Sequence, residues 1–307
     1  MQTHLRQRAA FLVVTVFIFV GAAQASPPAA TRPTTNASEE VLDFTAVTDP
    51  AGSARLDVPY VSQATAQQAL DIYWPAKGKA AAAVIYVHGG EWAKGDKGNV
   101  AFKPRFLTRH GVALVSINYR LSDKAQHPAQ VTDIAAAIRW VGVHGGELGI
   151  DSKRIYLMGH SAGCHLVLLT ALDPRPLAGV GLKPSDLAGV ISWSGGAFDL
   201  VEKVKQGGLY AKCIRINFSA DARVWRDASP INHVTDCKPL PPILLISAEK
   251  DSADSIAANK RLRDRIAAAG GRVQWMLLGG KSHGTADHDL GKPGDSSGEI
   301  LLRFLGR

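Results

Sequence analysis

The most constraining feature of the chain is a regular alternation between short apolar runs and segments with helical periodicity. The apolar runs have the length of buried strands and occur at 82–87, 112–117, 154–158, 188–192, 242–246 and 272–278. Helical patterns lie between or after them, near 128–143, 162–172, 253–269 and 296–305. Strands that alternate with helices favour crossover connections, which place parallel strands side by side. The pattern therefore predicts an α/β fold with a mostly parallel central sheet and helices on both faces.

Two segments depart from this alternation. Residues 69–74 alternate between apolar and polar side chains and stop at Pro75, which is typical of an edge strand. Segment 197–236 has no strand–helix pattern, and a connection of this length in a compact domain is often functional. We expect it to form a short lid-like insertion at the carboxyl edge of the sheet. The insertion would belong to a single domain that covers residues 41–307.

The N-terminus has the three parts of a secretory signal peptide. Residues 1–8 carry positive charge and no acid, residues 9–20 are uninterruptedly apolar, and Ala23-Gln24-Ala25 precedes Ser26 as a small-residue cleavage site. An uncleaved membrane anchor is the alternative, but the apolar run is short for a membrane span. We therefore expect a signal peptide over residues 1–25 and an exported product, periplasmic or secreted, without a stable membrane anchor after cleavage.

Composition and charge exclude several classes of protein. With 46% hydrophobic and 20% charged residues, the chain can bury a core and is not globally disordered. Only residues 26–40, rich in Pro, Thr, Ser and Ala, are expected to form a disordered linker. The formal net charge falls from +8 to +6 when Arg6 and Arg8 leave with the signal peptide. Because the remaining basic residues are scattered, nucleic acid is not an expected partner.

Three cysteines allow at most one disulfide. Export permits disulfides, and Cys213 and Cys237 lie in one irregular region. Closing the loop between them would contribute about 3 kcal/mol to stability. Two unpaired buried thiols are the alternative. Cys164 lies in an apolar stretch and is expected to be buried as a small hydrophobic residue.

Gly159-His160-Ser161-Ala162-Gly163 matches the pattern G-x-S-x-G directly between a predicted strand and a predicted helix. Small residues at positions 159 and 163 let the backbone reverse tightly, and the turn lifts the Ser161 hydroxyl above the edge of the sheet. The free N–H groups at the start of the following helix favour negative charge there. Ser161 is therefore the candidate nucleophile.

A serine hydroxyl needs a base, and the base needs an acid that orients it. His283 follows the last predicted strand, where this chain order places the base, and His288 is its rival. Asp251 follows the strand at 242–246 and is the candidate acid. Its rivals are Asp254, which suits the start of the next helix, and Glu249. The order nucleophile, acid, base differs from that of chymotrypsin-like and subtilisin-like proteases.

The strand at 82–87 ends in His88-Gly89-Gly90-Glu91-Trp92. Two glycines after a buried strand allow backbone N–H groups to face a substrate. Together with the N–H of Ala162 they would form a pocket for a tetrahedral oxyanion. An ordinary Gly-Gly turn is the alternative.

With these motifs the chain resembles the α/β-hydrolase fold. Within that fold it is most similar to small carboxylesterases with an HGG loop, near the hormone-sensitive-lipase-like and BD-FAE-type esterases and the kynurenine formamidase branch. The segments that carry the resemblance are 70–75, 88–92, 95–97, 117–121, 159–163 and the loops of Asp251 and His283, which together span about residues 65–305.

The resemblance implies oxyanion donors at the backbone N–H groups of Gly90 and Glu91, with Ala162 as the third. The family often has glycine where this chain has Glu91, so the carboxylate must point away from the oxyanion. The family's acid loop often continues with Val-Pro, which is absent after Asp251.

The residues together predict a serine carboxylesterase that hydrolyses short-chain or aryl carboxylic esters through an acyl-enzyme. Its partner would be a small-molecule ester, and neither a metal nor an organic cofactor is needed. Trp92 and Trp193, with Trp225, are candidates to line the substrate pocket; a core position is the alternative for Trp193. The alternative functions are an arylformamidase or other amidase with the same three residues, and a catalytically inactive binding protein on the hydrolase scaffold.

Overall fold

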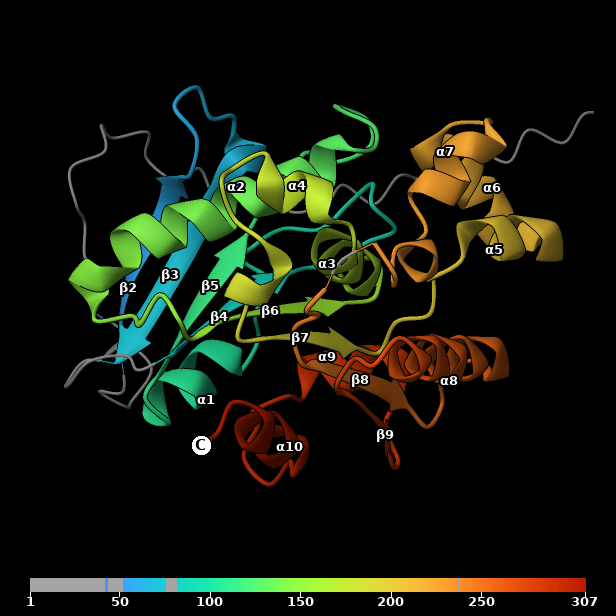
Figure 1. The fold of residues 1–307 in the computed structure, drawn as a ribbon. Helices are drawn as coiled ribbons and strands as arrows, with labels where there is room; N and C mark the ends of the chain where they lie inside the picture. Colours follow the sequence, from blue (N-terminus) through green and yellow to red (C-terminus); the bar gives the residue numbers. More distant parts are fainter. Residues whose placement is uncertain (1–41, 44–51, 76–81, 237) are drawn as a thin grey trace, which may run out of the picture. The chain divides into compact units, whose positions relative to one another are not determined.

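A nine-stranded sheet forms the centre of the computed structural model, which describes residues 42–43, 52–75, 82–236 and 238–307 (Figure 1). The strands are β1 (Leu42–Asp43), β2 (Gly52–Pro59), β3 (Ala69–Pro75), β4 (Ala82–Val87), β5 (Val112–Ile117), β6 (Ile155–His160), β7 (Gly189–Trp193), β8 (Ile243–Ala248) and β9 (Val273–Leu278). Their order across the sheet is β1-β2-β3-β5-β4-β6-β7-β8-β9. From β5 to β9 all neighbouring strands are parallel, whereas β1, β2 and β3 are added in antiparallel fashion. The predicted α/β class and mostly parallel sheet are confirmed.

Most predicted elements are found with nearly the same bounds. The α-helices are α1 (Lys103–Arg109), α2 (Ala129–His144), α3 (Ala162–Leu172), α4 (Pro174–Ala178), α5 (Leu200–Gln206), α6 (Gly208–Phe218), α7 (Ala222–Asp227), α8 (Ala253–Ala268), α9 (His283–His288) and α10 (Ser297–Phe304). Short 3-10 turns add η2 (Ala66–Gln68), η3 (Gly145–Leu148), η4 (Pro184–Asp186) and η5 (Pro230–Asn232). The apolar runs at 82–87 and 112–117 and the helix at 162–172 match the predicted ranges.

The prediction of an edge strand at 69–74 is wrong. β3 lies inside the sheet, between β2 and β5, and all but one of its residues are buried. The alternation reflects Asp71, a polar residue that is buried and paired with Lys97 rather than exposed to water. A period of two therefore does not distinguish a solvated face from a face that carries a buried ion pair.

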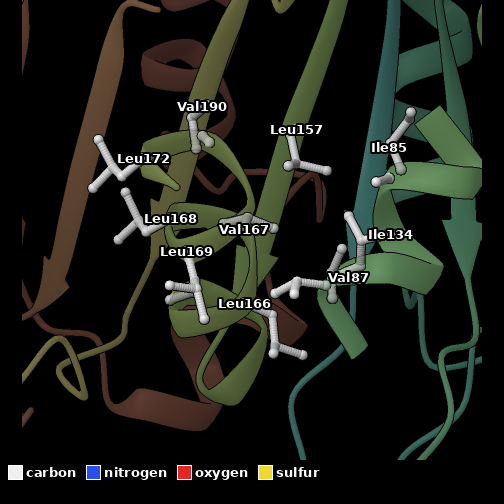
Figure 2. Close-up of a cluster of buried hydrophobic side chains, with 14 of the residues drawn as sticks. Ile85, Val87, Ile134, Leu157, Leu166, Val167, Leu168, Leu169, Leu172 and Val190 are labelled. Atoms are coloured by element: carbon white, nitrogen blue, oxygen red, sulfur yellow. The ribbon is translucent and has the colours of Figure 1, made fainter. Parts of the chain in front are cut away.

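Successive residues of the central strands supply two separate cores. Ile85 and Val87 of β4 pack into the core beneath α2, α3 and α8, whereas Val84 and Tyr86 pack into the core beneath α1, α9 and α10. Figure 2 shows the first core, where strand side chains meet the leucines of α3. Every residue of α3 is buried. The predicted helices on both faces are confirmed. Packing against these two cores fixes α3 and α9, the two helices that begin at the candidate site.

Segment 197–236 folds into α5, α6, α7 and η5 between β7 and β8. The three helices lie together beyond the carboxyl ends of the parallel strands (Figure 1). Its predicted role as a lid stays a prediction.

The signal peptide predicted for residues 1–25, the linker at 26–40 and Cys237 lie outside the described residues. Within the described ranges, no helix combines the length and apolar character that crossing a bilayer requires.

Candidate active site

Ser161 lies in a tight turn between β6 and α3. Its backbone has φ 55° and ψ −117°, a left-handed conformation that costs a non-glycine residue about 1–3 kcal/mol. The glycines of the motif make this turn sterically possible. A Cβ on Gly163 would lie 2.1 Å from the carbonyl oxygen of Val87, and a Cβ on Gly159 would lie 2.3 Å from the carbonyl carbon of Gly163. The motif therefore holds the Ser161 hydroxyl at the carboxyl edge of the sheet.

The structure brings the three predicted side chains together. His283 is the first residue of α9, and its Nε2 lies 2.9 Å from Ser161 Oγ. Its Nδ1 lies 3.1 Å from Asp251 Oδ1. Both distances are within hydrogen-bond reach, so one imidazole connects the hydroxyl to the carboxylate.

The rival residues lie elsewhere. His288 is exposed and its Nδ1 is 3.2 Å from Asp289. Asp254 forms an ion pair with Lys203 of α5. Glu249 accepts a hydrogen bond from the backbone N–H of Gly280. None of these contacts involves Ser161 or His283.

Asp251 is held in its ionised form by hydrogen bonds. Burial raises the pKa of this carboxyl, but hydrogen bonds from His283, from the Ser194 hydroxyl and from the backbone N–H of Ala248 outweigh burial and leave the pKa below its usual value. Ser194 is a site residue that the sequence analysis missed. The sequence did offer a signal for this residue, because Ser194 directly follows β7, at the same edge of the sheet as the other loops that follow strands.

The loop after β4 has an unusual backbone. Gly90, Glu91 and Trp92 all have positive φ, at 114°, 56° and 61°. Within the described part of the chain, the backbone N–H groups of Gly90, Glu91 and Ala162 have no protein acceptor. The Glu91 carboxylate is exposed and lies 3.5 Å from Lys94 Nζ.

Helix α6 holds this loop in place. Asn217 Nδ2 donates a hydrogen bond of 2.9 Å to the carbonyl oxygen of Glu91, and Asn217 Oδ1 accepts one from the Ser122 hydroxyl. Asn217 is itself buried. The segment between β7 and β8 is therefore bonded directly to the predicted oxyanion loop.

The structure corrects the assignment of Trp92 to the substrate pocket. The side chain is 1% exposed, and rings of His165 and Phe218 pack edge-on against it. Burial lowers the pKa of His165 to about 3, so its ring is neutral. The neutral ring accepts the indole N–H of Trp92 at Nδ1 and donates from Nε2 to the carbonyl oxygen of Ala228. Trp92 thus anchors the loop that carries Gly90 and offers no surface to a substrate.

Trp193 is corrected in the same way. It is 0% exposed, and its indole N–H donates a hydrogen bond of 2.7 Å to the carbonyl oxygen of Ala286 in α9. It therefore secures the helix that begins with His283. Trp225, the third aromatic candidate, is also buried.

A buried ion pair lies beneath α9. Lys103 is 1% exposed, and its Nζ lies 2.9 Å from Asp287 Oδ1 and donates to the Asp287 carbonyl oxygen at 2.9 Å. The Tyr86 hydroxyl donates to the same carboxylate at 2.8 Å. One turn away, His160 Nε2 donates to the carbonyl oxygen of His283. The Asp287 side chain is only 17% exposed.

A pocket of about 290 Å³ opens at Ser161 and His283. Its remaining walls are formed by the glycines after β7, by α5 and α6, and by the start of α8; they include Gly195, Gly196, Lys203, Gln206, Tyr210, Ser252, Asp254 and Ser255. The Lys203–Asp254 ion pair and a hydrogen bond of 3.0 Å from Gln206 to Asp254 join α5 to α8 across this wall. Polar and apolar surface contribute comparably to the lining, and the charges of Lys203 and Asp254 are paired.

The structure tests part of what the sequence predicts for the cysteines. Cys164 is fully buried, as expected. Cys213 is a free thiol in the structure, and its sulfur accepts a hydrogen bond from Asn217. Because Cys237 lies outside the described residues, the pairing with Cys213 stays a prediction.

Comparisons with known proteins find relatives that are named as esterases. A search of curated proteins finds isoprenylcysteine alpha-carbonyl methylesterase ICME of Arabidopsis thaliana, 27% identical over 70% of this chain and 53% of the relative. It also finds esterase LipQ of Mycobacterium tuberculosis, 31% identical over 69% of this chain and 53% of the relative. The chain thus spans about half the length of these curated relatives.

Solved structures share the fold. Esterase B from Lactobacillus rhamnosis is 23% identical, with a TM-score of 0.69 over 82% of this chain and 84% of that chain. A carbohydrate esterase from gut microbiota is also 23% identical, with a TM-score of 0.66 over 83% of this chain and 96% of that chain. At these identities the likeness establishes the α/β-hydrolase fold alone. The BD-FAE family model matches residues 70–266, which include the serine turn, the loop after β4 and Asp251, and the chain therefore belongs to the BD-FAE family.

Proposed function

We propose that this protein is a serine carboxylesterase that hydrolyses short-chain or aryl carboxylic esters through an acyl-enzyme. The observation that carries the proposal is the continuous hydrogen-bonded path from Ser161 Oγ through His283 to Asp251, with distances of 2.9 and 3.1 Å. This arrangement suits removal of the serine proton by a neutral imidazole whose other nitrogen is held by a carboxylate. The esterases among the relatives support the same class of reaction.

In the proposed mechanism, Ser161 Oγ attacks the ester carbonyl carbon while its proton passes to His283 Nε2. The carbonyl oxygen becomes an oxyanion, which the N–H groups of Gly90, Glu91 and Ala162 would stabilise. His283 then protonates the leaving alcohol, and the acyl group stays on Ser161. Water, deprotonated by His283, attacks the acyl carbon; as the bond to Ser161 Oγ breaks, His283 returns the proton to that oxygen and the acid is released. Asp251 stabilises the imidazolium in both steps.

The pocket restricts the ester that fits. Its volume of about 290 Å³ is at the lower end of the range for small-molecule sites, which leaves little room for a long acyl chain beside the leaving group. We therefore expect kcat/KM for p-nitrophenyl acetate and butyrate to exceed that for the octanoate by about 10-fold or more, because the small pocket leaves the added methylenes of the longer chain exposed to water.

A panel of such esters together with an N-formyl arylamide tests the proposal. Hydrolysis of the short esters with little activity on the formyl arylamide is the expected result. Preferred cleavage of the formyl arylamide would instead assign an arylformamidase. A pure, folded protein without activity on any member of the panel would favour a binding protein on the hydrolase scaffold.

We further propose that the protein is exported, on the strength of the charged, apolar and small-residue segments within residues 1–25. N-terminal sequencing of the protein from the periplasm or medium of an expressing bacterium is expected to begin at Ser26. A cell-associated chain that still begins at Met1 would contradict both export and cleavage.

A further inference from the structure

Ser194 occupies a central position among the three predicted site residues. It directly follows β7, is 0% exposed, and has its Oγ 2.8 Å from Asp251 Oδ2 and 3.0 Å from Asp251 Oδ1. The same oxygen lies 3.0 Å from His283 Nδ1. Its hydroxyl therefore contacts the acid and the base at once, on the side of the imidazole that faces away from Ser161.

The hydrogen-bonding capacity of these groups fixes the direction of each bond. An ionised carboxylate only accepts, and a hydroxyl has one proton, so the Ser194 proton goes to Asp251. The lone pairs of Ser194 Oγ can then accept from His283 Nδ1. The proton on Nδ1 is shared between Asp251 Oδ1 and Ser194 Oγ, which leaves Nε2 unprotonated and directed at Ser161.

The backbone of Ser194 makes a third connection. Its carbonyl oxygen accepts a hydrogen bond of 3.2 Å from the N–H of Ser161, and its own N–H donates 2.9 Å to Ile246 of β8. Ser194 has φ 60°, a left-handed conformation that glycine adopts without strain and serine does not. A glycine at position 194 would avoid this strain, and the contacts of the Ser194 hydroxyl offset it.

We propose that Ser194 is a positioning residue of the active site: its hydroxyl holds the Asp251 carboxylate and fixes the imidazole of His283 in the tautomer that accepts a proton from Ser161. The proposal rests on the hydrolase function proposed above. It assigns to Ser194 no contact with the substrate, so its effect acts on the chemical step rather than on substrate binding.

The test compares Ser194→Ala with Ser194→Gly. Both lack the hydroxyl, but glycine also relieves the backbone strain. We expect both variants to lose about 10- to 100-fold in kcat on p-nitrophenyl acetate with KM nearly unchanged, as for loss of a hydrogen bond to a charged group. Ser192→Ala is the matched control, because Ser192 is a fully buried serine of β7, two residues before Ser194, without a hydrogen bond to Asp251 or His283.

A double-mutant cycle separates this role from a merely structural one. In an Asp251→Asn background the Ser194 hydroxyl no longer contacts the charged carboxylate that it orients. Adding Ser194→Ala to that background is therefore expected to lower kcat by less than about 3-fold. Melting temperatures of all variants report whether they fold.

Three results would overturn the proposal: a kcat within twofold of wild type for Ser194→Ala, full activity in Ser194→Gly, or losses that multiply in the double variant. Inactive wild-type protein would instead refute the proposed function itself, so the two failures are distinguishable.

Discussion

Replacement of Ser161 by alanine is expected to lower kcat/KM for a short-chain ester by about 10⁴- to 10⁶-fold. The variant keeps the loop after β4 and the pocket, so it retains substrate binding but has no oxygen with which to form the acyl-enzyme. The size of the effect follows from the geometry: within the described residues, the only hydroxyl hydrogen-bonded to His283 Nε2 is that of Ser161, at 2.9 Å. Steady-state kinetics on the purified variant measure the loss.

A fluorophosphonate probe gives a readout that does not depend on the choice of ester. Wild type is expected to add one label at Ser161, and Ser161→Ala none. His283→Ala should lose activity on the same scale, whereas His288→Ala, its exposed neighbour five residues on, should behave as wild type. Undiminished hydrolysis by Ser161→Ala would contradict the mechanism.

The parts of the site that the sequence predicted are those encoded locally. The turn of Ser161 needs small residues at fixed spacing because of close backbone approaches within the turn and to β4. Asp251 and His283 were found because each follows a strand, and the carboxyl ends of parallel strands meet at one edge. The bounds of α3 and β4 followed from hydrophobic runs for the same local reason.

The environment of the aromatic residues could not be predicted from the sequence. Trp92 and Trp193 follow or end strands at the correct edge, and that position alone suggested contact with a substrate. Whether a large ring faces a pocket or the core depends on residues far away in the chain. Phe218 and His165 enclose Trp92, and Ala286 accepts the hydrogen bond of Trp193.

Buried polar residues were missed for a related reason. Ser194, Lys103 and Asp287 are residue types that are usually exposed, so a sequence analysis assigns them to the surface. Ser194 and Lys103 are fully buried and Asp287 is mostly buried, because a partner from another element satisfies each of them. These pairings join positions 57 to 201 residues apart, such as Ser194 with Asp251 and Tyr86 with Asp287.

The buried pair beneath α9 leads to the largest expected effect on stability. Lys103→Met is expected to lower the free energy of unfolding by about 3–5 kcal/mol, because it leaves the Asp287 carboxylate without its cation. Replacing both partners by apolar residues, as in Lys103→Met with Asp287→Leu, should recover part of this loss. Lys124→Met is the matched control: Lys124 and Asp123 form an exposed pair, and the change should cost less than about 1 kcal/mol. Denaturant unfolding measures all three.

The acid sensitivity of the fold tests the same pair independently. Burial raises the pKa of Asp287, but the charges of Lys103 and His160 and the hydrogen bonds from Lys103 and Tyr86 outweigh burial and lower the pKa below its usual value. A carboxyl whose pKa is lowered by folding stabilises the fold above its unfolded pKa of about 3.9, and this contribution is lost as pH falls through the folded value.

The stability difference between wild type and Asp287→Asn should therefore be largest near neutral pH and shrink as the pH falls below about 4. Because α9 begins with His283, the same variant should also lose kcat at temperatures where it remains folded. A stability difference that is constant with pH, or equal losses from Lys103→Met and Lys124→Met, would show that the pair does not hold α9 in place.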